Sequence, residues 1–189
     1  MARSFAAVLA LLLAGTATAQ DRDLDYSYLE ASYANADYDR FRGDGDGFGI
    51  AASLELTDNI HVFGGYSGAD VASNIDTDGW HAGIGINVPL GDLLDAVVGL
   101  SYQSTDLGLP GGGSLNDDGF GLRAGIRALA NEWIELNGGL TYVDLDSGKD
   151  TQLDAGFLVN IADAFAVGVS GKWGDNLKIW SLNGRLYFE

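Results

Sequence analysis

Nine ionisable residues of this chain lie in stretches where apolar residues alternate with small or polar ones, and they occupy the polar positions. There they could form ion pairs with one another. Four are acidic, four are Lys or Arg and one is His, so the set is nearly balanced although the whole chain has a formal charge of -17. Unpaired charges are costly to bury, whereas opposite charges on neighbouring strands stabilise each other. We therefore expect a structural salt-bridge network of Glu30, Glu55, His61, Arg123, Arg127, Glu135, Asp154, Lys172 and Arg185.

The spacing of these residues around the expected turns assigns four pairs. Reflection about Asn131 gives the first pair and reflection about Asp58 gives the second. The pairs are Arg127 with Glu135, Glu55 with His61, Asp154 with Lys172 on a diagonal, and Glu30 with Arg185 across the seam between the first and last strands.

The same residue types could carry acid-base or nucleophilic chemistry, but their spacing gives this little support. The chain has two histidines and no cysteine. His61 and His81 are expected at opposite ends of one polar face, where they are poorly placed to share a site. Residues 74–79 look like the start of a calcium loop but lack its leading Asp and its terminal Glu. We expect no catalytic site, no metal and no cofactor, and an enzyme ranks third among the functions considered.

Period-two alternation identifies the elements that must position these charges. In residues 119–142, apolar side chains alternate with Gly, Arg, Glu, Asn and Thr on both sides of a short polar break at Asn131 and Glu132. Successive side chains of a strand point to opposite faces, so this stretch is predicted to be a β-hairpin with one apolar and one polar face.

The pattern recurs along residues 20–189 and predicts a single all-β domain. The strands are expected at about 25–35, 48–56, 60–66, 80–88, 96–103, 119–130, 134–142, 153–160, 165–173 and 177–188. The fold class is a transmembrane, up-and-down antiparallel β-barrel of ten strands, with eight strands as the alternative.

Two regularities favour a membrane barrel. Short breaks near 57–59, 91–92, 131–132 and 161–163 alternate with longer ones at 36–47, 69–78, 106–118 and 144–150. Aromatic residues gather at the long-loop end of the strands, as in a girdle at the lipid-water interface. The girdle is predicted to contain Tyr33, Phe48, Tyr66, Trp80, Tyr102, Phe120, Tyr142, Trp173 and Trp180.

A soluble, lipocalin-like barrel with the apolar face inside is the alternative to a membrane barrel. A soluble exterior is roughly a quarter to a third charged. Here the polar face is mostly Gly, Ser, Asn and Thr with few charges, which favours placing that face in the lumen.

The first residues are predicted to be a secretion signal. Arg3 precedes an apolar run, and Ala17-Thr18-Ala19 has the small residues that a signal peptidase accepts. We therefore expect a signal peptide at 1–19 and a mature chain at 20–189. Later stretches fall short of the roughly 20 apolar residues of a spanning helix, so membrane spanning would need strands.

The excess acid lies in the expected loops, and it limits the partners. A strongly acidic protein is a poor ligand for nucleic acid. Lipopolysaccharide is also anionic, so contact with it would need bridging divalent cations. We expect a monomer that contacts outer-membrane lipid and lipopolysaccharide, the latter through such cations, and that binds no nucleic acid.

Three stretches, GDGDGFGIAASLELTDNI, NDDGFGLRAGIRALANEWIELNGGLTYVDL and the final RLYF, resemble the small outer-membrane β-barrel proteins of Gram-negative bacteria, the OmpA/OmpX-like group. The resemblance covers essentially the whole mature chain. It implies a location in the bacterial outer membrane, with long loops extracellular and both termini periplasmic, and contact with the barrel assembly machinery through the C-terminal aromatic Phe188. The chain departs from the group by adding Glu189 and by having ten expected strands where OmpA and OmpX have eight.

These features together predict a structural or surface-interaction role for a barrel whose lumen is largely plugged by salt bridges. A narrow, weakly selective, porin-like channel is the second function considered.

Overall fold

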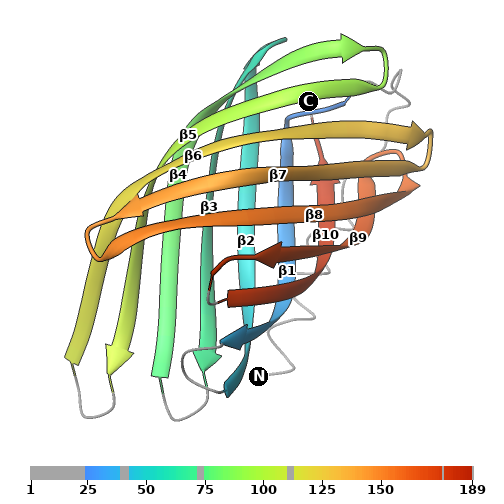
Figure 1. Cartoon of the computed structure of the whole chain (residues 1–189). Helices are drawn as coiled ribbons and strands as arrows, with labels where there is room; N and C mark the ends of the chain where they lie inside the picture. Colours follow the sequence, from blue (N-terminus) through green and yellow to red (C-terminus); the bar gives the residue numbers. More distant parts are fainter. Residues whose placement is uncertain (1–23, 39–42, 72–74, 110–112, 176, 189) are drawn as a thin grey trace.

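The computed structural model describes residues 24–38, 43–71, 75–109, 113–175 and 177–188. Its ten strands are β1 (Tyr28–Tyr38), β2 (Gly43–Thr57), β3 (Ile60–Val71), β4 (Ile75–Gly91), β5 (Leu94–Leu109), β6 (Gly113–Asn131), β7 (Ile134–Leu145), β8 (Gly148–Ala162), β9 (Phe165–Trp173) and β10 (Leu177–Tyr187). Each strand pairs antiparallel with the next and β10 pairs with β1, which closes the barrel (Figure 1). The predicted ten-stranded all-β barrel is confirmed, and the alternative of eight strands is wrong.

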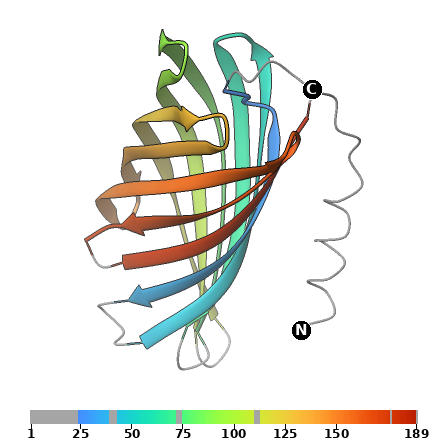
Figure 2. The same ribbon diagram turned by 90° about the vertical axis from the view of Figure 1, so that its right-hand side faces the viewer.

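The two ends of the barrel differ. We call the end with the β2–β3, β4–β5, β6–β7 and β8–β9 connections the turn end, and the opposite end the hairpin end; Figure 2 shows the barrel from the side. Among the described residues, no helix is long and apolar enough to cross a membrane. The expected signal peptide at 1–19 lies outside the described residues.

The outer face of the barrel is apolar and the lumen is polar. On β6, Leu122 and Ile126 point outward and are 53 % and 52 % exposed, whereas Arg127 points inward and is 8 % exposed. Burial is therefore inverted relative to a soluble protein, as expected for strands whose outer side chains face lipid. The lipocalin-like alternative does not fit this arrangement.

The four connections at the turn end share one design. Each is a two-residue turn that starts with an acidic residue, namely Asp58, Asp92, Glu132 or Asp163. The pairing of the flanking strands is symmetric about that residue, and a β-bulge interrupts it next to the turn. In the β6–β7 turn, Asn131 Oδ1 accepts hydrogen bonds from the backbone N–H groups of Trp133 (2.8 Å) and Ile134 (3.0 Å).

This design corrects one predicted register. Glu55 does lie opposite His61. Arg127, however, lies opposite Asn137, and Glu135 lies opposite Leu129. The prediction reflected the chain about Asn131, but the centre of symmetry is Glu132, the acidic residue that begins the turn.

The expected long loops are largely β-structure. Residues 106–109 and 113–118, predicted to be loop, continue β5 and β6, and Leu107 lies opposite Leu115 in the same register. The expected loop at 144–150 is a tight hairpin, with a turn at Asp146 and Ser147 followed by Gly148 at φ 153°. Extending the ladder satisfies backbone N–H and C=O groups that a loop would leave unpaired, and this outweighs the low strand propensity of Asp and Gly.

The predicted aromatic girdle surrounds the outer face near the hairpin end. Ring centroids lie 5.5 Å apart for Trp80 and Tyr102, 5.6 Å for Tyr102 and Phe120, and 5.3 Å for Trp173 and Trp180. Trp173 is half-buried, and the other predicted girdle residues are exposed.

Aspartates continue the girdle toward the hairpin end. Strands β2, β4 and β6 each carry an Asp-Gly-aromatic segment, beginning at Asp46, Asp78 and Asp118. The hydroxyl of Tyr33 donates to Asp46 (3.3 Å), and that of Tyr66 donates to Asp78 (2.5 Å). Each tyrosine ring therefore contacts the apolar belt while its hydroxyl reaches a carboxylate, an arrangement suited to a lipid-water boundary.

Candidate functional site: the barrel lumen

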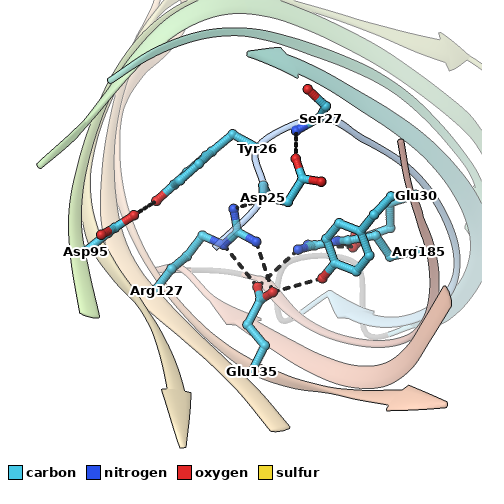
Figure 3. A network of polar contacts seen from close by, with 9 residues as sticks. Asp25, Tyr26, Ser27, Glu30, Asp95, Arg127, Glu135 and Arg185 are labelled. Atoms are coloured by element: carbon cyan, nitrogen blue, oxygen red, sulfur yellow. Dashed lines mark hydrogen bonds and ion pairs between the residues drawn. The ribbon is translucent and has the colours of Figure 1, made fainter. Parts of the chain in front are cut away.

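Glu135 on β7 is the centre of a charge network inside the lumen near the turn end (Figure 3). Its carboxylate, in a residue only 2 % exposed, accepts hydrogen bonds from Arg127 Nε (3.0 Å) and Nη2 (2.9 Å), Arg185 Nη1 (3.1 Å) and the Tyr187 hydroxyl (2.8 Å). Strands β7 and β10 are not neighbours in the sheet. The contact between Glu135 and Arg185 therefore crosses the lumen.

Arg185 extends the network to the seam that closes the barrel. Its Nε and Nη2 atoms lie 2.8 and 2.7 Å from Glu30 Oε2, and the two residues are directly opposite on β10 and β1, as predicted. Its guanidinium carbon lies 4.1 Å from the centroid of the Tyr28 ring, within the range of a cation–π interaction. We call Glu30, Arg127, Glu135, Arg185 and Tyr187 the Glu135 network.

The Glu135 network is balanced and hydrogen-bonded throughout. Two guanidinium groups, Arg127 and Arg185, face two carboxylates, Glu30 and Glu135. Buried charges persist where such geometry compensates for lost hydration, and the loss of one partner leaves the other uncompensated. The network therefore holds four strands, β1, β6, β7 and β10, in fixed positions across the lumen.

Residues 25–27 complete this layer, although the sequence pattern places them in the first strand. β1 begins only at Tyr28. Before it, the Tyr26 ring enters the lumen, where it is 2 % exposed and its hydroxyl donates to Asp95 Oδ2 (2.9 Å) (Figure 3). The signal that could have located this turn is Asp25, whose side chain accepts a hydrogen bond from the Ser27 backbone N–H (2.7 Å), as in an Asx-turn.

His61 is packed against Tyr26 and does not pair with Glu55. The two rings stack with centroids 4.7 Å apart. Glu55 and His61 lie opposite each other in the ladder, yet the described residues contain no ion pair between them. The Glu55 backbone N–H instead donates to Ser27 Oγ (3.2 Å), so both residues contact the segment that precedes β1.

Asp154 pairs with a different partner from the predicted one. It is directly opposite Lys172 in the ladder rather than on a diagonal. Its carboxylate, however, forms a bidentate ion pair with Arg123, with Nη2 to Oδ2 at 2.7 Å. Arg123 reaches across Gly139 of the intervening strand β7, where a side chain would block it. Lys172 remains solvent-accessible.

Glycines make room for the large side chains of the lumen. A Cβ atom at Gly85 would lie 2.2 Å from His61 Nε2, and one at Gly83 would lie 2.8 Å from Phe63 Cζ. A Cβ atom at Gly121 would lie 2.1 Å from Gln103 Nε2. These close approaches show that the inward glycines are covered by neighbouring side chains, so much of their space is filled rather than open to water.

One cavity of about 200 Å³ lies beside the Glu135 network. Its lining includes Tyr26, His61, Phe63 and His81 on one part of the wall, and Arg123, Arg127 and Arg185 on another. Phe63 separates the two histidines, with ring centroids 6.0 Å from His61 and 6.1 Å from His81. Within the described part of the chain, no three His, Cys, Asp or Glu residues gather closely enough to hold a metal ion.

Solved structures with the same fold are membrane barrels. They include the transport unit of the autotransporter AIDA-I from Escherichia coli, at TM-score 0.55 and 12 % identity, covering 99 % of this chain and 98 % of that one. The translocator domain of the autotransporter NalP from Neisseria meningitidis has TM-score 0.53 and 12 % identity, covering 85 % and 87 %. The KdgM porin in complex with disordered oligogalacturonate has TM-score 0.52 and 9 % identity, covering 86 % and 99 %. At these identities the likeness shows the fold alone.

The sequence comparison identifies the family. No curated protein matches the chain significantly. The family model described as outer membrane protein beta-barrel domain matches residues 6–172. With its closed ten-stranded barrel and lipid-facing apolar exterior, the chain therefore belongs to the outer-membrane β-barrel protein family and is a transmembrane barrel of the bacterial outer membrane.

Proposed function

We propose that this protein is an outer-membrane barrel with a closed lumen. Its role is structural or lies in surface interactions, and solutes do not pass through its lumen. The supporting observation is the Glu135 network, in which Arg127, Glu135, Arg185 and Glu30 are joined by ion pairs from β6 across to β1. Ten strands enclose a lumen only slightly wider than the eight-stranded barrel that side chains fill. A single layer of hydrogen-bonded side chains is then enough to block it.

The rest of the layer is also filled. Tyr26 and His61 cover the wall of β3 and β5, and Leu158 of β8 is buried at 2 % exposure. Ala166 of β9 is completely buried. Charged, aromatic and aliphatic groups thus contribute to closure from nearly every side of the barrel.

An osmotic swelling assay tests this closure for small solutes. Vesicles containing the refolded barrel should swell in isotonic arabinose or glycine no faster than vesicles without protein. Swelling at a rate that rises with protein content would contradict the closed lumen.

A narrow pore is the second candidate, and the cavity of about 200 Å³ favours it. The KdgM porin has the same fold, but a likeness at 9 % identity does not carry its transport to this chain. If this candidate is correct, the swelling assay gives protein-dependent uptake of the smallest solutes only.

For orientation, we propose that the hairpin end is extracellular and that both chain ends are periplasmic. The girdle and its aspartates support this, because both lie at the end where β4, β5 and β6 are extended. Protease shaving of intact cells should cleave a site inserted after Gly113 and spare one inserted after Asp92. The reverse pattern would contradict the orientation.

We propose lipopolysaccharide as the surface partner, contacted through divalent cations. The support is electrostatic: Asp46, Asp78 and Asp118 lie beside the girdle, where the anionic headgroups of lipopolysaccharide would meet the barrel in the proposed orientation. Both surfaces are negative, so Mg²⁺ or Ca²⁺ would relieve their repulsion through weak, multiple contacts.

Calorimetry tests this partner. Titration of Mg²⁺ into the barrel reconstituted with lipopolysaccharide should give more heat than into lipopolysaccharide alone. The triple variant Asp46→Asn, Asp78→Asn, Asp118→Asn should lose most of the difference, and an Asp163→Asn variant at the turn end should retain it. Equal heats for all samples would rule the contact out.

We also propose that the protein is a monomer without enzymatic activity. The closed barrel of the described residues has no free sheet edge for pairing with a second copy.

We propose in addition that the chain contacts the barrel assembly machinery through Phe188. Phe188 follows β10 and is 40 % exposed, so it is accessible to a partner. Phe188→Ala should lower the amount of assembled barrel in cells, and unchanged assembly would contradict the contact.

A further inference from the structure

Residues 25–27 fold into the lumen instead of continuing β1 outward along the sheet. The Tyr26 ring is almost fully buried, and Ser27 is buried with it. Figure 3 shows the Tyr26 side chain extended across the lumen toward Asp95, with the Arg127 guanidinium beside it. This short segment therefore occupies space that the strands themselves leave unfilled.

The segment contacts four strands, the neighbouring strand β2 and, across the lumen, β3, β5 and β6. Tyr26 donates to Asp95 of β5, stacks on His61 of β3, and lies under Arg127 of β6 with 4.4 Å between the guanidinium carbon and the ring centroid. The Asp25 carbonyl accepts a hydrogen bond from Arg127 Nη1 (2.9 Å). Ser27 Oγ accepts one from the β2 backbone at Glu55 (3.2 Å).

We propose that residues 25–27 are a latch for the lumen, and that Asp95, His61 and Arg127 form the internal site that binds the Tyr26 phenol. Release of the phenol opens a water path along the wall of β3 and β5. This inference rests on the proposed closed barrel and assigns the control of that closure to a specific segment.

The latch can leave while the barrel stays intact. The contacts of Asp25 and Tyr26 with the lumen wall lie outside the strand ladders, which begin at Tyr28. They include the Tyr26 hydroxyl, the Asp25 carbonyl and the Tyr26 backbone N–H, which interacts with the Glu55 carboxylate. Ser27 is anchored by its carbonyl, which accepts a hydrogen bond from the Phe188 backbone N–H (3.1 Å), so it holds the segment in place when Tyr26 leaves. The cavity of about 200 Å³ also borders Tyr26. When the ring moves away, the volume that it occupied therefore becomes continuous with this cavity. By contrast, removing the Glu135 network would require breaking buried ion pairs between strands.

The charge of the receiving site favours a phenol. Asp95 is 7 % exposed and accepts the phenol hydrogen, while Arg127 faces the ring as a cation. A phenylalanine would keep the stacking but leave the Asp95 carboxylate without this donor. Hydrogen bonds to charged groups are among the stronger ones in proteins, so their loss should shift the latch equilibrium markedly toward release.

Planar-bilayer recordings of the full-length refolded protein test the latch with Tyr26→Phe and Tyr26→Ala. We expect Tyr26→Phe to raise the time-averaged current about tenfold above the residual leak of the native barrel, and Tyr26→Ala to raise it further. Tyr66→Phe is the matched control, because it removes a tyrosine-aspartate hydrogen bond on the outer face. This control should behave like the native protein. Native-level currents from Tyr26→Phe and Tyr26→Ala would overturn the latch.

Thiol labelling gives a second test that needs no current. The chain has no cysteine, so Ser27→Cys places a single thiol in the latch. A charged methanethiosulfonate reagent should modify this thiol slowly, and about tenfold faster when Tyr26→Phe is added. Equal rates in the single and double variants would overturn the latch even if Tyr26→Ala does not refold.

The outcomes separate the latch from the proposed function. A silent native barrel with silent Tyr26 variants overturns the latch and leaves the closed barrel standing. Steady native currents overturn the closed barrel, whereas a further increase in Tyr26→Phe still supports control by Tyr26.

Discussion

At the scale of single residues, side-chain reach decides which charges pair. Strand parity places each of the nine predicted network residues in the lumen, and the seam pair Glu30 and Arg185 follows directly from closing the barrel. Parity determines the face on which a side chain lies but not its partner, because a long side chain can reach beyond the neighbouring strand. Arg123 bypasses its own neighbours and crosses Gly139 to reach Asp154, which a ladder diagram assigns to Lys172.

The Glu135→Gln variant tests the centre of the network. Arg127 and Arg185 would keep their charges but lose the carboxylate between them, and breaking a buried pair by removing one partner costs about 3–5 kcal/mol. We expect a loss of this size in the free energy of unfolding, measured by urea titration in lipid vesicles. Asp146→Asn, on an exposed turn, is the control and should be near neutral. Similar stability for both variants would mean that Glu135 is not the hub of the network.

The Gly139→Val variant tests the space that Arg123 needs. A Cβ atom there would lie 2.9 Å from both Arg123 Nη2 and the Ala124 carbonyl oxygen, so the ion pair with Asp154 must shift. Overpacking of this kind destabilises by about 1–3 kcal/mol. Gly91→Ala is the control, because a Cβ atom there would meet nothing within 4 Å. Thermal unfolding in the same vesicles should show a lower midpoint for Gly139→Val than for Gly91→Ala.

At the scale of elements, the turns carry the information that fixes register. Reflection about Asp58 is correct for β2 and β3, and reflection about Glu132 would have been correct for β6 and β7. The sequence shows the common signal, an acidic residue at the start of each turn, but the bulges become visible only when all four turns are compared in the structure. The sequence also fails to predict the strand extensions, because Asp and Gly are typical of loops although the ladder continues through them.

The Asn131→Ala variant tests the turn design. It removes the oxygen that accepts two backbone hydrogen bonds from Trp133 and Ile134. A loss of about 1 kcal/mol in the free energy of unfolding is expected, with slower refolding of the hairpin. Intrinsic fluorescence during refolding, to which Trp133 in this turn contributes, measures both effects. An unchanged refolding rate and stability would show that the bulge, and not Asn131, sets the turn.

At the scale of the whole molecule, periodicity was sufficient for the fold. Alternation along each strand predicts which face meets lipid and where the girdle lies, and the number of alternating segments predicts the ten strands. The contents of the lumen depend on contacts between residues distant in sequence. Tyr26 and Asp95, 69 residues apart, are in contact only because a segment outside the strand ladder turns into the lumen. Strand periodicity gives no information about such a segment.

Planar-bilayer recording of the unmodified, refolded protein tests the closed lumen most directly. At neutral pH and moderate salt, we expect a quiet baseline from the native barrel. Channels should appear in the double variant Arg127→Ala, Glu135→Ala, which removes a charge pair from the Glu135 network. Stable open-channel currents from the native barrel would contradict the closed lumen and establish the pore in its place.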